Sequence, residues 1–392
     1  MTKSDDKVPA LRFKGFTDEW EQRKLGDVAE IVGGGTPSTN ISKYWNGNIN
    51  WYSPTEIGSQ TFVNSSKKKI TELGLKESSA KLLPGKKTIL FTSRAGIGDM
   101  AIMNTDGSTN QGFQSWIVKP NITDIYFLYS LGGNLKKQAL RKASGSTFLE
   151  ISNSEVKKLS LYLPNFKEQT IIGKIIKLID KLITLQQRKV NNYFQYKTQL
   201  INTIFENKNW QMIKLKDVLS VPKKELANVT TKSQIMTVKL NLGGIVDGAN
   251  RDTLNPSATK YYIRHAGQFI FGKQNFFNGS MAIVPKAMDE KVTSQDVPAL
   301  NINNEKINSK FLLYYLSRKN FYKHTERFAT GTGSKRLHVD TLLNLKIRIP
   351  DISYQNQIVS TLTLLDKKLQ LETAKLNKLK QLKQFLLQNM FI

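Results

Sequence analysis

The chain has 392 residues, of which 39% are hydrophobic and 9% aromatic, so it can build more than one packed core and is not a disordered chain. Its 58 lysines and arginines against 31 aspartates and glutamates give a net charge of +27, which points to a polyanionic partner, either nucleic acid or an acidic membrane surface. The sequence has no cysteine, which excludes disulfides, thiolate metal sites and a cysteine nucleophile.

The first globular part is expected to span residues 1–165 and to mix strands with short helices. Residues 88–91 form a short β-prone run between glycine- and serine-containing segments. Residues 126–131 are typical of a short buried helix, and residues 159–163 alternate like a strand that ends at Pro164. This mixture predicts an α+β domain.

A long helix is predicted next, over residues 166–207. A proline lies just before it, where a helix can begin but not continue, and apolar residues then recur at steps of three and four. Gly173 is a mild helix penalty, on the order of 1 kcal/mol relative to alanine. The apolar stripe predicted to pair with another helix consists of Ile172, Ile176, Ile179, Ile183 and Val190.

The second half of the chain repeats this plan. A second globular part is expected over residues 208–350, with a β-prone run at 267–271 and a short helix at 311–316. A second long helix is predicted over residues 351–392. Its apolar stripe consists of Leu362, Leu365, Leu369, Leu376 and Leu379.

The two halves match without a gap from Pro164 and Pro350 to Phe205 and Phe391, and the segments that open each half also match. Between these zones the similarity is weak. The chain is therefore a tandem repeat of a variable globular part and a better-matched long helix. A lone helix could not hide such a stripe from water, so we expect the two helices to pair; packing of each helix on its own domain is the alternative.

The excess of positive charge lies mostly outside the two long helices. A membrane-binding amphipathic helix would instead carry its charge beside the apolar stripe, so membrane binding is the weaker hypothesis. Two basic globular parts joined by helices suit double-stranded DNA, where lysine and arginine displace condensed counterions.

No motif of a standard catalytic site is found. The sequence has no Pro-Pro pair, so the Asn/Asp-Pro-Pro-aromatic motif of adenine-N6 methyltransferases is absent, and no phosphate-binding loop is complete. The three histidines have no metal-ligand spacing, so no metal site and no cofactor are expected in this chain. Neither a signal-peptide pattern nor a long apolar window occurs, which predicts a cytoplasmic protein.

Three sets of loop residues are candidates for contact with DNA. Arginine and lysine recognise guanine, asparagine and glutamine recognise adenine, and flexible basic loops approach phosphates. The first set lies in the loops after the equivalent β-prone runs, the second is a further loop with glutamines in each half, and the third is the glycine-rich segment 331–336. The candidates are Ser93, Arg94, Gln111 and Gln114 in the first half, and Lys273, Gln274, Asn275, Gln295, Ser334, Lys335 and Arg336 in the second.

The segment Val8-Pro9-Ala10-Leu11-Arg12-Phe13-Lys14-Gly15-Phe16, followed by Trp20 and Lys24-Leu25-Gly26-Asp27, resembles the N-terminal signature of type I restriction–modification specificity subunits. Gly145-Ser146-Thr147 and Glu168-Gln169 are similar to motifs of the same family. The second half departs from the pattern, since Tyr354-Gln355 replaces Glu-Gln.

The resemblance implies a non-catalytic subunit with two target recognition domains, each of which reads one half of a split DNA sequence. It implies that the two helices form an antiparallel, pseudo-twofold coiled coil that sets the distance between the half-sites. It also implies two partner methyltransferase subunits that bind S-adenosylmethionine, with two restriction or translocase subunits as further partners. Because the globular parts differ, we expect an asymmetric bipartite site. A stand-alone DNA enzyme and a non-specific DNA-bridging protein are the alternatives.

Overall fold

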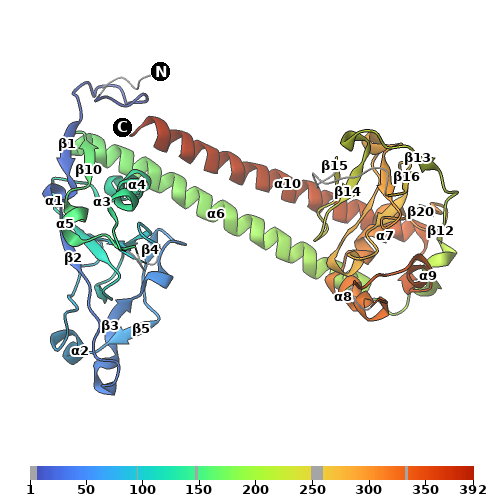
Figure 1. The fold of residues 1–392 in the computed structure, drawn as a ribbon, viewed down its shortest axis with the longest axis horizontal. Helices are drawn as coiled ribbons and strands as arrows, with labels where there is room; N and C mark the ends of the chain where they lie inside the picture. Colours follow the sequence, from blue (N-terminus) through green and yellow to red (C-terminus); the bar gives the residue numbers. More distant parts are fainter. Residues whose placement is uncertain (1–6, 95, 146–148, 249–258, 332–333) are drawn as a thin grey trace. The chain divides into compact units, whose positions relative to one another are not determined.

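A computed structural model describes residues 7–94, 96–145, 149–248, 259–331 and 334–392. It consists of two compact units: unit 1 is Met1–Gln187 with Ala374–Ile392, and unit 2 is Arg188–Thr373. The two predicted long helices are present as α6, Phe166–Phe205, and α10, Ile352–Asn389 (Figure 1). Each unit therefore contains one globular part and one section of each long helix.

The core of unit 1 is a sheet with the strand order β2-β9-β6-β7-β4. Its central strands β6 and β7 are buried along their whole length, because a hydrophobic core packs on each of its two faces. All of its pairings are antiparallel except that of β4 with β7. The strands are β2 Ala29–Gly33, β4 Phe62–Val63, β6 Thr88–Phe91, β7 Met100–Met103 and β9 Gln114–Val118.

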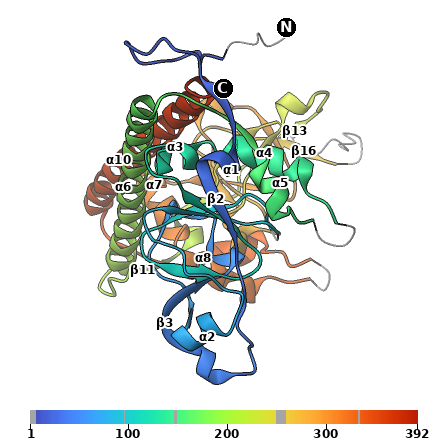
Figure 2. The same cartoon turned by 90° about the vertical axis from the view of Figure 1, so that its left-hand side faces the viewer.

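A smaller sheet with the order β5-β3-β8 extends this unit on the side away from α6 (Figures 1 and 2). A further pair, β1 with β10, brings the start of the globular part beside the strand that leads into α6. The remaining elements of unit 1 are β1 Glu21–Lys24, α1 Leu25–Val28, β3 Trp45–Tyr52, β5 Lys68–Ile70, α2 Glu72–Lys76, β8 Gly107–Thr109, α3 Ile125–Ser130, α4 Gly132–Lys142, α5 Asn153–Lys157 and β10 Ser160–Leu163.

Unit 2 contains the same central strands in the order β12-β20-β17-β18. Its additions differ from those of unit 1, with one sheet ordered β13-β16-β19 and a separate pair of β14 with β15. The strands are β11 Gln211–Lys214, β12 Leu219–Ser220, β13 Leu226–Ala227, β14 Met236–Val238, β15 Ile245–Asp247, β16 Tyr261–Ile263, β17 Phe269–Phe271, β18 Met281–Ile283, β19 Val292–Ser294, β20 Ala299–Ile302 and β21 Lys346–Ile349.

The short helices of unit 2 are α7 Ser309–Leu316, α8 Lys319–His324 and α9 Val339–Leu343. Short 3₁₀ helices occupy Ser42–Tyr44, Pro54–Glu56, Leu215–Asp217, Lys232–Gln234, Phe276–Asn278, Lys286–Met288 and Thr325–Phe328. The α+β class is confirmed, and the shared four-strand core explains why the two halves repeat although their loops do not match.

Each long helix begins with the same set of hydrogen bonds. The buried amide of Gln169 accepts from Asp124 N (3.1 Å) and donates to the carbonyls of Ile122 (3.2 Å) and Pro164 (2.9 Å). In unit 2, buried Gln355 accepts from Asn308 N (2.9 Å) and donates to two equivalent carbonyl groups. In both units the glutamine therefore joins the start of the long helix to the cap of a short helix, α3 or α7.

Gly173 has a packing reason that the sequence did not reveal. A Cβ at this position would lie 2.3 Å from Asp124 Oδ1 and 3.1 Å from Phe127 N, so only glycine lets α6 approach the N-terminus of α3 this closely. The equivalent residue in α10 is Val359, which packs in the core of unit 2. Unit 1 therefore has both the close approach of the two helices and the helix penalty of glycine, and unit 2 has a valine at the same place.

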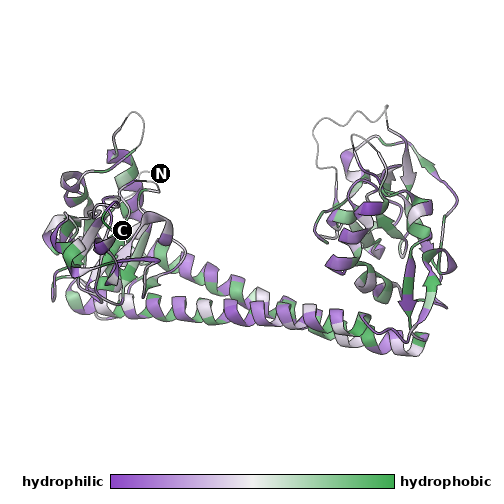
Figure 3. Ribbon diagram, turned by 90° about the horizontal axis from the view of Figure 1, so that it is seen from below, coloured by the Kyte–Doolittle hydropathy of each residue, from purple (hydrophilic) through white to green (hydrophobic). Residues whose placement is uncertain are grey.

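The long helices run antiparallel, as two ion pairs of unit 2 demonstrate. Lys189 of α6 pairs with Glu372 of α10, and Lys197, further along α6, pairs with Asp366, which comes earlier in α10. Hydrophobic residues recur along both helices between hydrophilic ones (Figure 3). Of the predicted stripe, Ile172, Ile176, Ile179, Leu362 and Leu376 are buried, and Ile183, Val190, Leu365, Leu369 and Leu379 are half-buried.

The ends of the stripes also belong to the globular cores. Ile172 and Ile176 pack in the same core as Met390 and Phe391, which follow α10, whereas Leu362 packs in the core of unit 2. The two predicted modes of packing, helix on helix and helix on domain, therefore occur together. Within the part of the chain that the structure describes, no helix is long and apolar enough to cross a membrane.

Candidate nucleic-acid interface

Three segments of unit 1 meet at Ser93, just after strand β6. The Ser93 amide donates to the Gly112 carbonyl (2.8 Å), and the Ser93 carbonyl accepts from the Ile151 amide (3.0 Å). We call residues 92–94, 110–113 and 149–151 the first loop cluster. Backbone hydrogen bonds hold its segments together, so the side chains beside Ser93 keep fixed positions relative to one another.

Unit 2 builds the same junction at Lys273, just after strand β17. The Lys273 amide donates to the Asp296 carbonyl (2.9 Å), and the Lys273 carbonyl accepts from the Leu337 amide (2.8 Å). We call residues 272–275, 295–297 and 334–337 the second loop cluster. Because both hydrogen bonds recur, Ser93 and Lys273 occupy equivalent positions, as do Ile151 and Leu337.

A narrow hairpin supplies the third segment of each cluster. Ser144 and Glu150 exchange two backbone hydrogen bonds of 3.0 Å in unit 1, and Thr330 and Arg336 exchange bonds of 3.1 and 2.8 Å in unit 2. The residue after each hairpin's first partner is a glycine with positive φ, 134° at Gly145 and 121° at Gly331, which other residues rarely adopt. Residues 146–148, 332 and 333, between the paired positions, lie outside the described residues.

Different side chains occupy the equivalent positions of the two clusters. In the first, Arg94 Nη1 lies 3.9 Å from Glu150 Oε2, and both side chains are partly exposed. In the second, the amide oxygen of Gln274, oriented by its partners, accepts from Arg336 Nη2 (2.9 Å) and Nε (3.3 Å). The first cluster thus pairs a cation with an anion where the second pairs an amide with a cation.

Ser93 is the least accessible of the candidate residues in the first loop cluster. Its side chain is fully buried, its backbone holds the cluster together, and its contact with DNA stays a prediction. A loop serine directly after a buried strand looks accessible in the sequence, but the hairpin folds over it through Ile151.

Two glutamines of unit 1 are joined to neighbouring segments. The Gln111 amide oxygen accepts from the Thr36 hydroxyl, and Gln111 is exposed. The Gln114 amide oxygen, at the first position of β9, accepts from Asn153 Nδ2 (2.8 Å), and Gln114 is half-buried. Gln111 is therefore the better placed of the two to meet a ligand.

In the second cluster, Gln295, Ser334, Lys335 and Arg336 are exposed, and Lys273, Gln274 and Asn275 are half-buried. Lys335 Nζ forms an exposed ion pair with Glu326 (2.9 Å). The structure brings all of these residues into one cluster, and their contact with DNA stays a prediction.

Three residues that the sequence analysis did not consider support the clusters. Glu150 faces Arg94, and Asp296 Oδ2 lies 3.8 Å from Arg336 Nη2. Arg264 is buried and donates from Nε to the Thr293 hydroxyl (2.7 Å) and from Nη2 to the Val297 carbonyl (3.1 Å), which fixes the turn that carries Asp296. Burial lowers the pKa of Arg264 to about 10, so it remains charged at neutral pH.

The repeat itself carried a signal for Glu150. Continuing the match of Gly145 with Gly331 places Glu150 opposite Arg336, one residue before the shared apolar position. No comparable signal marks Arg264, because its role depends on a turn about thirty residues further along the chain. Among the described residues, no group of three or more histidines, aspartates or glutamates is placed to hold a metal ion.

The sequence of the chain is similar to a family model and to known proteins. The family model of the type I restriction modification DNA specificity domain matches residues 17–192 and again residues 207–381. The chain is 28% identical over 368 residues to the type I restriction enzyme MjaIX specificity subunit of Methanocaldococcus jannaschii, covering 85% of this chain and 83% of that protein. It is 33% identical over 182 residues to the EcoR124I/EcoR124II specificity subunit of Escherichia coli, 45% of this chain and 43% of that protein.

The fold also matches a solved structure. The type I restriction–modification S subunit from M. genitalium superposes with a TM-score of 0.62 at 15% identity, over 98% of this chain and 99% of that one. At that identity the likeness concerns the fold alone. The family model, in contrast, covers most of the sequence in two copies. The chain therefore belongs to the type I restriction–modification DNA specificity family and carries two copies of its domain.

Proposed function

We propose that this chain is the non-catalytic DNA-recognition subunit of a type I restriction–modification complex, acting in the cytoplasm, and that each loop cluster reads one half of an asymmetric bipartite DNA site. The observation that carries the proposal is the pair of loop clusters, which share one backbone frame and differ in the side chains that it presents. A common frame with different side chains is the arrangement that two different half-sites require.

The chemistry of the clusters suits DNA. Arg94 can pair with guanine, and Gln274 and Asn275 can pair with adenine, through the donor and acceptor pattern of the major groove. Lys335 and Arg336 lie on the exposed hairpin, where they suit phosphate contacts that position the protein without reading the sequence. The net charge of +27 supplies the general attraction to the DNA backbone.

The partners proposed are two adenine methyltransferase subunits, which would supply S-adenosylmethionine, with two restriction or translocase subunits as optional members. Matched apolar residues on the outer faces of the long helices support a partner present in two copies. Leu178 and Leu185 of unit 1 are exposed, and so are the equivalent Leu364 and Leu371 of unit 2. Exposed apolar side chains repeated in this way are typical of protein interfaces.

Mapping methylated adenines in cells with and without this chain tests the proposal. We expect N6-methyladenine at one split, asymmetric motif only when the chain is present. A palindromic motif would contradict the asymmetry, and an unchanged methylation pattern would contradict the proposed function. Purified chain incubated alone with DNA and S-adenosylmethionine should give no methylation; turnover would support the stand-alone enzyme instead.

An exchange between the clusters sharpens the test. Arg94→Gln combined with Glu150→Arg gives the first cluster the pair found at Gln274 and Arg336. The first half-site of the methylated motif should change while the second stays the same. Competition with random DNA covers the alternative of a non-specific bridging protein, which would bind specific and random DNA equally.

A further inference from the structure

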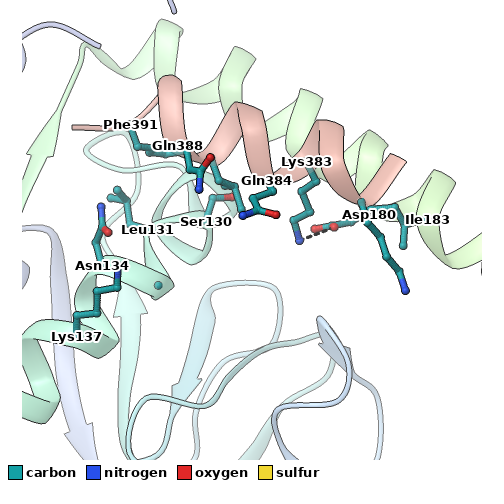
Figure 4. Close-up of a pocket in the computed structure, with 13 residues that line it drawn as sticks. Ser130, Leu131, Asn134, Lys137, Asp180, Ile183, Lys383, Gln384, Gln388 and Phe391 are labelled. Carbon is teal, nitrogen blue, oxygen red and sulfur yellow. Dashed lines mark ion pairs between the residues drawn. The ribbon is translucent and has the colours of Figure 1, made fainter. Parts of the chain in front are cut away.

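One carboxylate in unit 1 joins three helices. Asp180 of α6 accepts from the Tyr126 hydroxyl of α3 at Oδ2 (2.7 Å) and from Lys383 Nζ of α10 at Oδ1 (2.6 Å). Asp180 and Lys383 face each other at the edge of a cavity between the short helices and the long ones (Figure 4). Through Asp180 the globular part is therefore bonded to both long helices at once.

Unit 2 contains the same arrangement with the roles of the long helices exchanged. Asp366 of α10 accepts from the Tyr314 hydroxyl of α7 at Oδ2 (2.5 Å), and its Oδ1 pairs with Lys197 of α6. Lys197 Nζ also lies 5.5 Å from the centre of the Tyr314 ring. Each unit thus has one Tyr–Asp–Lys cluster that connects a globular part with both long helices.

The two tyrosines do not come from equivalent positions. Tyr126 lies two residues after the cap of its helix, Asp124, whereas Tyr314 lies six residues after the equivalent cap, Asn308. Four residues make about one helical turn, so both tyrosines lie on the same face of their helices. The contact to the aspartate is therefore kept while the residue that makes it differs, which argues for a role of the contact itself.

The tyrosines keep their protons. Burial, and then the hydrogen bond to the aspartate, raise the pKa of Tyr126 and of Tyr314 well above the ordinary value. At neutral pH each hydroxyl is therefore protonated and donates to its carboxylate. The lysine supplies the opposite charge, so the aspartate has one directed partner on each of two other helices.

Beyond the hydrogen bonds of Gln169 and Gln355 at the helix starts, the rest of this contact surface is largely apolar. Ile172 and Ile176 in unit 1, and Leu362 in unit 2, pack in the mixed cores of helix and globular part. Apolar packing tolerates small shifts better than a carboxylate that must meet a hydroxyl and an ammonium group together. The Tyr–Asp–Lys clusters are therefore directed contacts that, unlike those of Gln169 and Gln355, tie each globular part to both long helices.

We infer that Asp180 and Asp366 are positioning residues that set how each globular part sits on the long helices, and through this the number of base pairs allowed between the two half-sites. The inference rests on the proposed function. Neither aspartate is among the candidate DNA contacts, and each acts through its tyrosine and lysine.

The experiment uses the whole complex and a plasmid library in which the two half-sites are separated by the natural spacer or by one to three base pairs more or fewer. Asp180→Asn and Asp366→Asn remove the charge and keep the size. We expect the ratio of methylation at altered spacers to methylation at the natural spacer to rise by at least about fivefold for each variant, since hydrogen bonds to charged groups are among the stronger ones. The bases read in each half-site should not change.

Tyr126→Phe and Tyr314→Phe keep the ring and remove only the hydroxyl, so they provide the same test if the aspartate variants fold poorly. Lys181→Ala and Lys367→Ala, at exposed neighbouring positions, are the matched controls and should leave the spacer profile unchanged. If the phenylalanine and asparagine variants lose stability but keep the natural spacer preference, the clusters are merely structural and the inference is overturned. If the unmodified complex methylates no bipartite motif, the proposed function itself fails.

Discussion

Units 1 and 2 start their long helices alike but differ in one neighbouring contact. Gln169 and Gln355 make the same three hydrogen bonds. The preceding residue in unit 1 is buried Glu168, which accepts from Arg12 Nε and Nη2 (2.8 Å each). In unit 2 it is exposed Tyr354, whose ring meets that of Trp210 in a T-shaped arrangement.

The difference follows from what precedes each globular part. Unit 1 has an additional N-terminal segment, in which Leu11 N donates to Asn389 O (2.8 Å) and Arg12 reaches Glu168. Unit 2 follows α6 after a few residues and has no such segment, so a buried glutamate there would lack its cation. The missing segment thus explains why unit 2 has Tyr354 in place of a glutamate. The glutamine contact is shared by both units, whereas the contact of Arg12 with Glu168 belongs to unit 1.

Removing the cation of unit 1 should have the largest effect. Arg12→Ala leaves Glu168 buried without its partner, which costs about 3–5 kcal/mol. Hydrogen exchange of unit 1 peptides measures the loss, and unit 2 peptides should be unaffected. The control is Arg23→Ala, whose ion pair with Glu21 is exposed and should contribute less than about 1 kcal/mol. Equal effects of the two variants would show that the N-terminal segment does not stabilise unit 1.

The shared contact should respond equally in both units. Gln169→Leu and Gln355→Leu each leave one amide and two carbonyl groups without their partner, so each should destabilise its own unit by about 2 kcal/mol. Urea unfolding followed by hydrogen exchange separates the two units. Gln357→Leu, on the exposed side of α10, is the control. Clearly unequal losses of stability would mean that the two glutamines contribute differently to their units.

The loop clusters should respond differently from the helix contacts. Arg94→Ala should weaken binding to the cognate first half-site by about 1–3 kcal/mol if Arg94 reads guanine, with little change in stability. Competition between DNAs that differ in one half-site measures the effect. Arg141→Ala, an exposed arginine on α4, should have no sequence-dependent effect. An unchanged motif and affinity would remove Arg94 from the candidates.

The smallest effect is expected on the hairpin. Lys335→Ala should weaken binding to all sequences alike and reduce the slope of log affinity against log salt concentration by about 0.9 for one phosphate contact. Titrations at several salt concentrations with specific and random DNA measure this. Lys319→Ala, on α8, is the comparison variant. A loss confined to the specific DNA would show that Lys335 reads bases.

Much of the candidate site is built from contacts between distant segments of the chain, which no local sequence pattern indicates. Arg94 and Gln274 were predicted from loops that follow matching strands, and the structure places both in the clusters. Ser93 proved buried, and Arg264 was missed, because burial and support are decided by segments far along the chain. Which of these residues touch DNA stays a prediction.

By itself, the sequence determined the two long helices, the duplication and a few of the short strands and helices, because hydrophobic periodicity, prolines and internal repeats are properties of the sequence alone. The tertiary structure alone decided that three distant segments meet at Ser93 and at Lys273, that Gly173 lies against the cap of α3, and that one aspartate in each unit joins three helices. Such contacts are formed by backbone and side-chain groups many residues apart, and they exist only once the sheets and helices have packed.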